Sequence, residues 1–399
     1  MSNNSRVDII RKMIEQIELP EHAMQKAIER YEDIGEWLGR EESIVAEFEP
    51  HIFPQGSFRL GTAVRPLDAS DEYDIDLSCK LCSGITKENM SQKDFKELVG
   101  EELEKYRIAR GIRNKLDAKR RCWRLEYQDE ISFHIDIVPC LPTDELTRET
   151  YMTALHSSGM EELIALEAAN TTVYITDNQK LNYEIISDDW HISNPEGYAK
   201  WFEYKMQPEK MIALLEKAKV DDVPLFRRKN PLQIVIQLLK RHRDNWSCSL
   251  SDSKPISIII TTLAAHAYNG ESDIISALKN IVNNMERFIR TSIPRVPNPV
   301  DPKEDFADKW YDKDCKHLNL EKNFYQWLLS AKKDFNQILS SDSVLLLSDT
   351  LNKRFEIKVK DDDLLKVVGI SNASSVISKP VYAIKNEEVS RPWCKGKLL

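Results

Sequence analysis

The sequence has few glycines, few cysteines and no leader-like apolar segment. Of its 399 residues only 12 are glycine and seven are cysteine, and the cysteines are scattered along the chain. An odd, scattered set argues against a disulfide-stapled secreted domain and is typical of free thiols in a reducing compartment. The first residues, MSNNSRVDIIRKMIEQ, contain no apolar core of the signal-peptide type. These absences predict a cytoplasmic protein.

The sequence also has no apolar run long enough for a membrane and no excess of basic residues. The most apolar run, Ile256 to Ala265, is interrupted by a serine and two threonines and is too short to span a bilayer. The formal net charge is −9. Because an acidic protein gains nothing from counterion release, we expect no sequence-independent binding to long nucleic acid. A chain that is 41% hydrophobic and 30% charged, at this length, can form two lobes with ample core.

Hydrophobic spacing divides the chain into a mixed part and a helical part. Apolar residues three to four apart predict two helices within residues 6–45, separated at Pro20. From His51 to Pro142 the period changes to two, which predicts strands, with a helix at Gln92 to Arg110 between them. A hairpin turn is expected at Gln128-Asp129-Glu130, between the alternating stretches CWRLEY and SFHIDIV.

A second hairpin is expected from Thr172–Thr176 and Asn182–Ile186, and after Pro195 the pattern is almost wholly helical. The clearest helix is Pro231 to Asp244, with proline at its first turn. We therefore predict an α+β fold of two lobes. Residues 1–200 would form a mixed-sheet catalytic core with N-terminal helices, and residues 201–399 a mostly helical lobe that completes a cleft.

Three aspartates lie in the predicted strands. Asp74 and Asp76 are two residues apart in EYDIDL and therefore share a strand face, and Asp136 lies in the apolar stretch FHIDIVP. An isolated D-x-D pair is more often a solvated face. A third aspartate in an apolar strand is costly unless it is hydrogen-bonded or binds a metal. Three carboxylates suit Mg²⁺, with Mn²⁺ as the alternative. His134 shares the face of Asp136 and is either a neighbour of the metal ligands or merely packed.

The stretch FPQGSFRLGT places Gly56 and Ser57 after an extended segment. A Gly-Ser turn lets the backbone approach a ligand, and its N–H groups and hydroxyl can hold phosphate oxygens. Alone it is an ordinary strand-to-helix turn. Its combination with D-x-D and a distant third aspartate is far more specific. The sequence therefore predicts a phosphate-binding site beside a metal site.

These motifs resemble the polymerase-β-like nucleotidyltransferases, and within them the bacterial cGAS/DncV-like nucleotidyltransferases (CD-NTases). The resemblance rests on QGSFRLGT, EYDIDL, FHIDIVP, SNPEGYAKWF, PLQIVIQLLKRHRD, KPISIIITTL and NPVDPKEDFADKW, and covers about residues 10 to 340. It implies a template-independent enzyme that makes a cyclic di- or trinucleotide second messenger from NTPs in anti-phage defence. ATP is expected among the substrates, and an effector that binds the product is the expected partner.

The resemblance also assigns roles to residues. Asp74 and Asp76 would bridge two Mg²⁺ ions about 3.5–4 Å apart, and Asp136 would hold the catalytic ion. In the family a Lys on this helix and a later Ser hold the triphosphate, roles that fit Lys240 and Ser257. Gln55, Gly56 and Ser57 would complete the nucleotide site. Gln233, Gln237 and Lys240 form a polar stripe on an apolar helix, which a cleft would explain, whereas Arg241, His242 and Arg243 are expected to face solvent or the first lobe.

Alternatives remain at this point. One is a nucleotidyltransferase with an RNA or protein acceptor, for which the basic segment Arg107 to Arg121 would be the RNA-binding patch. Another is an inactive protein that senses nucleotides. The spacing of Cys79 and Cys82 is compatible with a zinc site, but no second Cys/His pair follows at the required spacing.

Some relatives are joined through a small C-terminal residue to other molecules by a ubiquitin-transfer-like partner. The ending Leu398-Leu399 differs from that pattern. We expect that this tail is not a conjugation handle.

Overall fold

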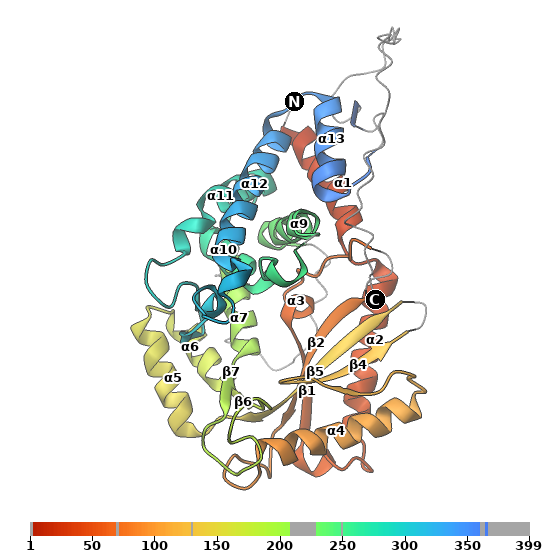
Figure 1. Ribbon diagram of the computed structural model, residues 1–399, viewed down its shortest axis with the longest axis vertical. Helices are drawn as coiled ribbons and strands as arrows, with labels where there is room; N and C mark the ends of the chain where they lie inside the picture. Colours follow the sequence, from red (N-terminus) through yellow and green to blue (C-terminus); the bar gives the residue numbers. More distant parts are fainter. Residues whose placement is uncertain are drawn as a thin grey trace.

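The computed structural model describes residues 3–68, 72–128, 131–207, 229–248, 250–359 and 364–365. A β-sheet flanked by helices forms the lower part of the molecule in Figure 1, and a group of helices forms the upper part. The predicted α+β class, with a mixed-sheet lobe and a mostly helical lobe, is confirmed. The C-terminal tail lies outside the described residues.

Within the described residues, the main sheet has seven strands in the order β1-β2-β5-β4-β3, with β6 paired to β5 and β7 to β6. Their bounds are Pro50–Gln55 (β1), Tyr73–Leu81 (β2), Asp117–Ala118 (β3), Trp123–Tyr127 (β4), Phe133–Pro142 (β5), Val173–Ile175 (β6) and His191–Ser193 (β7). β2 and β5 are parallel, and the other neighbours are antiparallel. The parallel pair is the one that carries the predicted aspartates.

One face of this sheet is covered by α2 (Glu21–Gly39) and α4 (Gln92–Ala109). Ile75 and Leu77 of β2 and Ile135 and Ile137 of β5 are at most 1% exposed and pack into this core. Because successive side chains of a strand point to opposite faces, Asp74, Asp76 and Asp136 must point to the other side of the sheet. The period-two pattern thus separates the core from the site.

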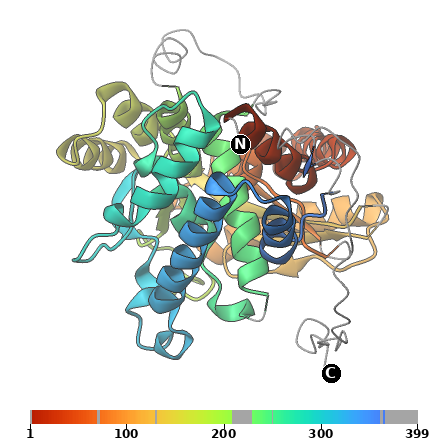
Figure 2. The same cartoon turned by 90° about the horizontal axis from the view of Figure 1, so that it is seen from above.

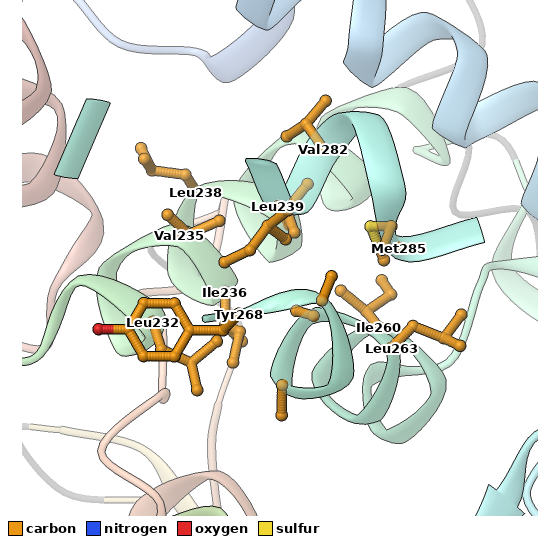
Figure 3. Close-up of a cluster of buried hydrophobic side chains, with 14 of the residues drawn as sticks. Leu232, Val235, Ile236, Leu238, Leu239, Ile260, Leu263, Tyr268, Val282 and Met285 are labelled. Carbon is orange, nitrogen blue, oxygen red and sulfur yellow. The ribbon is translucent and has the colours of Figure 1, made fainter. Parts of the chain in front are cut away.

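The helical lobe is built around α9 (Pro231–Trp246). A capping box at Asn230 and Gln233 and a proline at the first turn begin this helix. Five aliphatic residues of α9, Leu232, Val235, Ile236, Leu238 and Leu239, are fully buried, and Figure 3 shows them facing side chains of the neighbouring helices. The surrounding helices are α1 (Asn3–Ile17), α10 (Ser257–Ala267), α11 (Ile274–Asn284), α12 (Leu320–Ser340) and α13 (Val344–Phe355). Seen from above, α9 lies between α1 and α12 (Figure 2).

The remaining elements are short or peripheral. They are the helices α3 (Gly56–Arg59), α5 (Glu145–Ser157), α6 (Glu162–Asn170) and α7 (Pro195–Met206), and the two-stranded β8 (Pro297–Asn298) and β9 (Asp301–Asp305). α1 and α7 share one hydrophobic cluster with α9, although α1 precedes residue 201 and α7 spans it. The division at residues 200/201 stays a prediction. Within the described residues, no helix is both long and apolar enough to cross a membrane.

The second predicted hairpin is wrong. β6 pairs with β7 at residues 191–193, not with Asn182–Ile186, which lie in turns. Ile185 and Ile186 are 61% and 57% exposed, so no neighbouring strand covers them. The β-branched pattern misled the prediction because propensity for a strand needs a packing surface to be realised.

Candidate active site

Three carboxylates from two neighbouring strands meet on the side of the sheet that faces α9. Asp76 and Asp136 lie side by side in the parallel β2–β5 ladder, and Asp74 is two residues earlier on β2. One carboxylate oxygen from each residue lies within 4.8 Å of the other two. The structure therefore brings together the three aspartates that the sequence singled out.

This cluster holds more negative charge than its surroundings favour. Burial, together with the nearby charges of Asp74 and Asp136, raises the pKa of Asp76 to about 7. A divalent cation would offset this repulsion, and carboxylate oxygens are the ligands that Mg²⁺ and Mn²⁺ prefer. The carboxylate cluster thus fits a divalent metal site.

Arg124 lies beside the cluster and was missed by the sequence analysis. Its Nε and Nη2 donate to the two carboxylate oxygens of Asp136, at 2.6 and 2.7 Å, and this bidentate bond raises the pKa of Arg124. Arg124 and Asp136 are direct partners in the antiparallel β4–β5 ladder. Pairs counted outward from the predicted turn at 128–130 would have placed Arg124 opposite His134, two residues from its actual partner, so this register was not predicted from the sequence.

His134 bridges two acidic residues. Its Nε2 lies 2.9 Å from Asp74 Oδ1, and its Nδ1 lies 3.3 Å from Glu72 Oε2. The hydrogen bond to Asp74 raises the pKa of His134, which orients the exposed carboxylate of Asp74. Of the two readings of His134, the structure supports the neighbour of a metal ligand.

Gly56 is required by the approach of Asp76. Its φ is +61°, a conformation that disfavours side chains, and a Cβ built there would lie 3.2 Å from Asp76 Cγ and closer still to Oδ2. No residue with a side chain fits between the turn and this carboxylate. Ser57 follows on α3 and lines the same cavity as Asp74 and Asp76.

Gln55 lies next to the Gly-Ser turn, and its nucleotide contact stays a prediction. Its side chain lies against β2, where Nε2 donates to the Leu77 carbonyl at 3.4 Å and Oε1 accepts from Ser78 Oγ at 3.1 Å. Gln55 is not among the residues that line the cavity. In this position it fastens the Gly-Ser turn to the strand that carries Asp74 and Asp76.

The polar stripe on α9 fastens the segment that follows the Gly-Ser turn. Gln233 Nε2 donates to the Leu60 carbonyl at 2.9 Å, and Gln237 Nε2 donates to the Ala63 carbonyl at 2.7 Å. Lys240 Nζ bonds both the carbonyl and the hydroxyl of Thr62, at 3.1 and 3.2 Å. These bonds fix the position of the helical lobe relative to the turn.

Lys240 also lines the cavity, although it is only 4% exposed. Burial, with a smaller contribution from Arg243, lowers the pKa of Lys240 to about 7. An ammonium has three N–H donors, and Thr62 takes two of them. One donor therefore remains for a ligand.

The prediction that Arg241, His242 and Arg243 face solvent or the acidic first lobe is confirmed for Arg241, which bonds the first lobe. It is wrong for His242 and Arg243, which are at most 5% exposed and whose side-chain hydrogen bonds stay within the helical lobe. Arg241 Nη2 donates to the Arg65 carbonyl at 2.6 Å. His242 lies between Trp327 and Asp334 inside the helical lobe. A helix surrounded by other helices has no solvent face, which the periodicity of a single segment did not show.

Arg243 and Ser257 form the basic end of the cavity. Arg243 Nη1 donates to Ser257 Oγ at 2.7 Å, and Lys254 Nζ pairs with Asp244 at 3.2 Å. Ser257 is the first residue of α10, whose N-cap Ile256 supplies no side-chain cap. Arg243 also pairs with Asp244, so the anion-binding donors that remain here are chiefly the uncapped N–H groups at the start of α10.

Asp74 and Asp76, the Gly-Ser turn, Lys240 and the basic end at Arg243 and Ser257 border one cavity of about 1850 Å³. This exceeds the roughly 300–1,000 Å³ of a typical small-molecule site, so the cavity has room for more than one nucleotide.

Cys79 and Cys82 take no part in the site, since Cys79 is buried and Cys82 is exposed. Carboxylates on paired strands beside a Gly-Ser turn, facing a basic cavity end, define a nucleotidyltransferase.

Comparisons with known proteins show which nucleotidyltransferases this chain is similar to. Residues 50–140 match the family described as cyclic GMP-AMP synthase DncV-like, nucleotidyltransferase domain. The chain is 29% identical over 346 residues to a c-di-GMP synthase of Roseivirga ehrenbergii, covering 84% of this chain and 80% of the relative. It is 22% identical to the cyclic dinucleotide synthase CdnG of Bradyrhizobium diazoefficiens, over 77% of this chain and 71% of that protein.

Solved structures agree in fold. CdnG of Bradyrhizobium diazoefficiens, solved in complex with GTP, superposes with a TM-score of 0.64 at 20% identity, over 91% of this chain and 98% of that one. DncV of Vibrio cholerae superposes with a TM-score of 0.57 at 16% identity, over 90% and 97% of the two chains. The match at residues 50–140 is thus to a DncV-like nucleotidyltransferase domain, and the chain as a whole is similar to the bacterial cGAS/DncV-like nucleotidyltransferases (CD-NTases).

Proposed function

We propose that this protein joins NTPs, without a template, into a cyclic di- or trinucleotide second messenger and releases pyrophosphate. The observation that carries the proposal is the set of three carboxylates, two of which, Asp74 and Asp76, line a cavity with room for two nucleotides. The relatives named as c-di-GMP synthase and CdnG support the same activity. Guanine nucleotides are favoured as substrates because CdnG was solved with GTP, and ATP is a further candidate.

Asp74, Asp76 and Asp136 would hold two Mg²⁺ ions, with Mn²⁺ as a substitute. Bound metal would lower the pKa of the attacking ribose hydroxyl and neutralise charge on the transferred phosphoryl group. His134 and Arg124 hold two of these carboxylates in place. Gly56 keeps the turn close to Asp76, and Gln55 acts as a positioning residue for that turn.

The triphosphate would lie between the Gly-Ser turn and the start of α10. Ser57, Lys240 and Ser257 line the cavity and offer hydroxyl and ammonium donors, while Arg243 bonds Ser257 from behind. Holding two nucleotides at fixed positions converts a bimolecular reaction into an intramolecular one, which supplies most of the acceleration.

Lys240→Met is expected to raise the apparent KM for NTP by about 10-fold or more, because a charge-assisted bond to phosphate is worth roughly 1.5–3 kcal/mol. Steady-state kinetics at saturating Mg²⁺ would measure this. Thr62→Val, which removes only the hydroxyl partner of Lys240, is the matched comparison and should change KM less. An unchanged KM in the Lys240 variant would mean that Lys240 only holds the segment at Thr62 in place and does not bind the triphosphate.

An RNA acceptor is less favoured because acidic partners pair with four arginines of the basic segment 107–121. Arg107 pairs with Glu104, Arg110 with Asp33, and Arg120 and Arg121 with the 1%-exposed Asp177. Paired cations contribute little to the release of counterions from RNA. A cyclic product instead implies an effector that binds it, and we propose anti-phage defence as the setting.

The test is to incubate the purified protein with Mg²⁺ and α-³²P-labelled GTP or ATP, singly and with each other NTP, with and without added RNA. Label should appear in a small product that resists phosphatase. Label on RNA or on the protein itself would favour the macromolecular-acceptor alternative. Nucleotide binding without any product would favour a sensor.

A further inference from the structure

One end of the cavity is apolar, unlike the basic end at Arg243. Leu19, Val64, Pro66 and Leu67 line it. They converge because the backbone N–H of Arg65 donates to the Ile17 carbonyl at 2.7 Å, which fastens the segment after the Gly-Ser turn to the end of α1. Aliphatic walls of this kind suit the faces of a purine ring.

Glu356 brings a carboxylate to the same end of the cavity. It follows α13 and lines the cavity from a part of the chain remote from all the other lining residues. Lys358, two residues after Glu356, is held against α1. The Gln16 side chain of α1 bonds both the N–H and the carbonyl of Lys358, at 3.3 and 3.1 Å. Gln16 is three residues before Leu19, and Arg241, on which the charge of Glu356 acts, bonds the carbonyl of Arg65, between Val64 and Pro66. Both links place Glu356 near the segments that carry the apolar walls.

The Glu356 side chain is exposed to the cavity and fixed at its base. Phe355 and Ile357 on either side are at most 2% exposed, so both neighbours are anchored in the helical lobe. Its φ is +54°, a conformation that usually belongs to Gly or Asn at a helix end. A glutamate here costs stability, which indicates that the carboxylate has a use.

Glu356 also lacks a partner within the described residues. Glu72 bonds His134, and Asp244 bonds Arg243 and Lys254, whereas the Glu356 carboxylate accepts no hydrogen bond and forms no ion pair in the part of the chain that the structure describes. Its charge acts on the buried Arg241, but no hydrogen bond joins the two. Its acceptor capacity is therefore available to a ligand.

We propose that Glu356 selects guanine at this end of the cavity. A carboxylate accepts two parallel hydrogen bonds, and guanine offers a matching pair, N1–H and one N–H of the 2-amino group. Adenine has a hydrogen-bond acceptor at N1 and no 2-amino group. The lone pair of its N1 would face the carboxylate oxygens, which would then accept no hydrogen bond from the base. This proposal rests on the proposed nucleotidyltransferase function and names one base that the site takes.

The test measures binding rather than turnover, so that it is independent of product formation. Isothermal titration calorimetry with Mg²⁺ and the α,β-methylene analogues of GTP and ATP gives the affinity of each base. The wild type is expected to bind the GTP analogue more tightly. Glu356→Gln and Glu356→Gly should each weaken the GTP analogue by about 10- to 100-fold, the loss of hydrogen bonds to a charged group, and leave the ATP analogue within about twofold.

Glu356→Gly separates recognition from folding, because glycine adopts positive φ without strain and the variant should unfold at no lower temperature than the wild type. Asp349→Asn, which neutralises a carboxylate on α13 paired with Lys353 outside the cavity, is the matched control and should bind both analogues as the wild type does. Equal weakening of both analogues, unchanged affinity for the GTP analogue, or a wild-type preference for adenine would overturn the proposal. Guanine-selective binding without any cyclic product would refute the proposed function and leave the role of Glu356 standing.

Discussion

Asp76→Asn is expected to reduce product formation by about 1,000-fold or more while the protein stays folded. A metal ligand that stabilises several kcal/mol of transition-state charge accounts for a loss of this size. The fold should survive because the asparagine side chain has nearly the same shape. It also removes a buried charge that Asp74 and Asp136 repel.

Two measurements check this result. Turnover of NTPs with Mg²⁺ should be lost, and thermal unfolding in EDTA should occur at a temperature no lower than that of the wild type. Product at a near wild-type rate would contradict the assignment of the metal site. A much lower unfolding temperature would show instead that Asp76 has a structural role.

Gly56→Ala is also expected to reduce product formation strongly, by displacing Asp76 rather than by removing its charge. The added Cβ would collide with the Asp76 carboxylate, and the residue would have to keep φ near +61°. Either the turn or Asp76 must move, and a displacement of about 1 Å at a reacting centre can cost on the order of 100-fold in rate. The strained backbone should also lower the free energy of unfolding by about 1–2 kcal/mol.

Gly111→Ala separates the two effects. Gly111 has φ +65°, almost the same conformation, but a Cβ there would meet nothing within 4 Å. Its backbone strain should therefore match that of Gly56→Ala while its activity stays near the wild-type rate. Urea unfolding and steady-state rates of the two variants provide the comparison. Similar activity in both would mean that the contact between Gly56 and Asp76 has no functional importance.

The core of the site could be predicted because it depends on local rules. The alternation in EYDIDL and FHIDIVP assigns Asp74, Asp76 and Asp136 to one face, and the parallel pairing of β2 and β5 brings them together. Gly56 was predicted as a close approach to a ligand, and the structure shows that its nearest neighbour is Asp76 itself. Arg124 was not predicted, because the turn expected at 128–130 pairs it with His134 and not with Asp136.

The rest of the site depends on contacts between distant segments. Lys240 meets Thr62 across 178 residues, and Gln237 meets Ala63 across 174. A single helix pattern shows that a polar stripe is buried but not what it bonds. Glu356 gave no local signal, because a carboxylate after a helix is ordinary until the fold places it at a cavity wall. The buried His242 and Arg243 were mispredicted for the same reason.

The most direct test of the proposed activity is mass spectrometry of the reaction products. The protein should be incubated with Mg²⁺ and all four NTPs, and then treated with phosphatase to remove linear phosphate ends. A phosphatase-resistant mass equal to two or three nucleoside monophosphates less one water for each linkage would establish a cyclic product, and the Asp76→Asn variant should yield none. Linear oligonucleotides alone, or consumption of no NTP by a folded wild-type protein with Mg²⁺ or Mn²⁺, would contradict the proposed synthesis of a cyclic nucleotide.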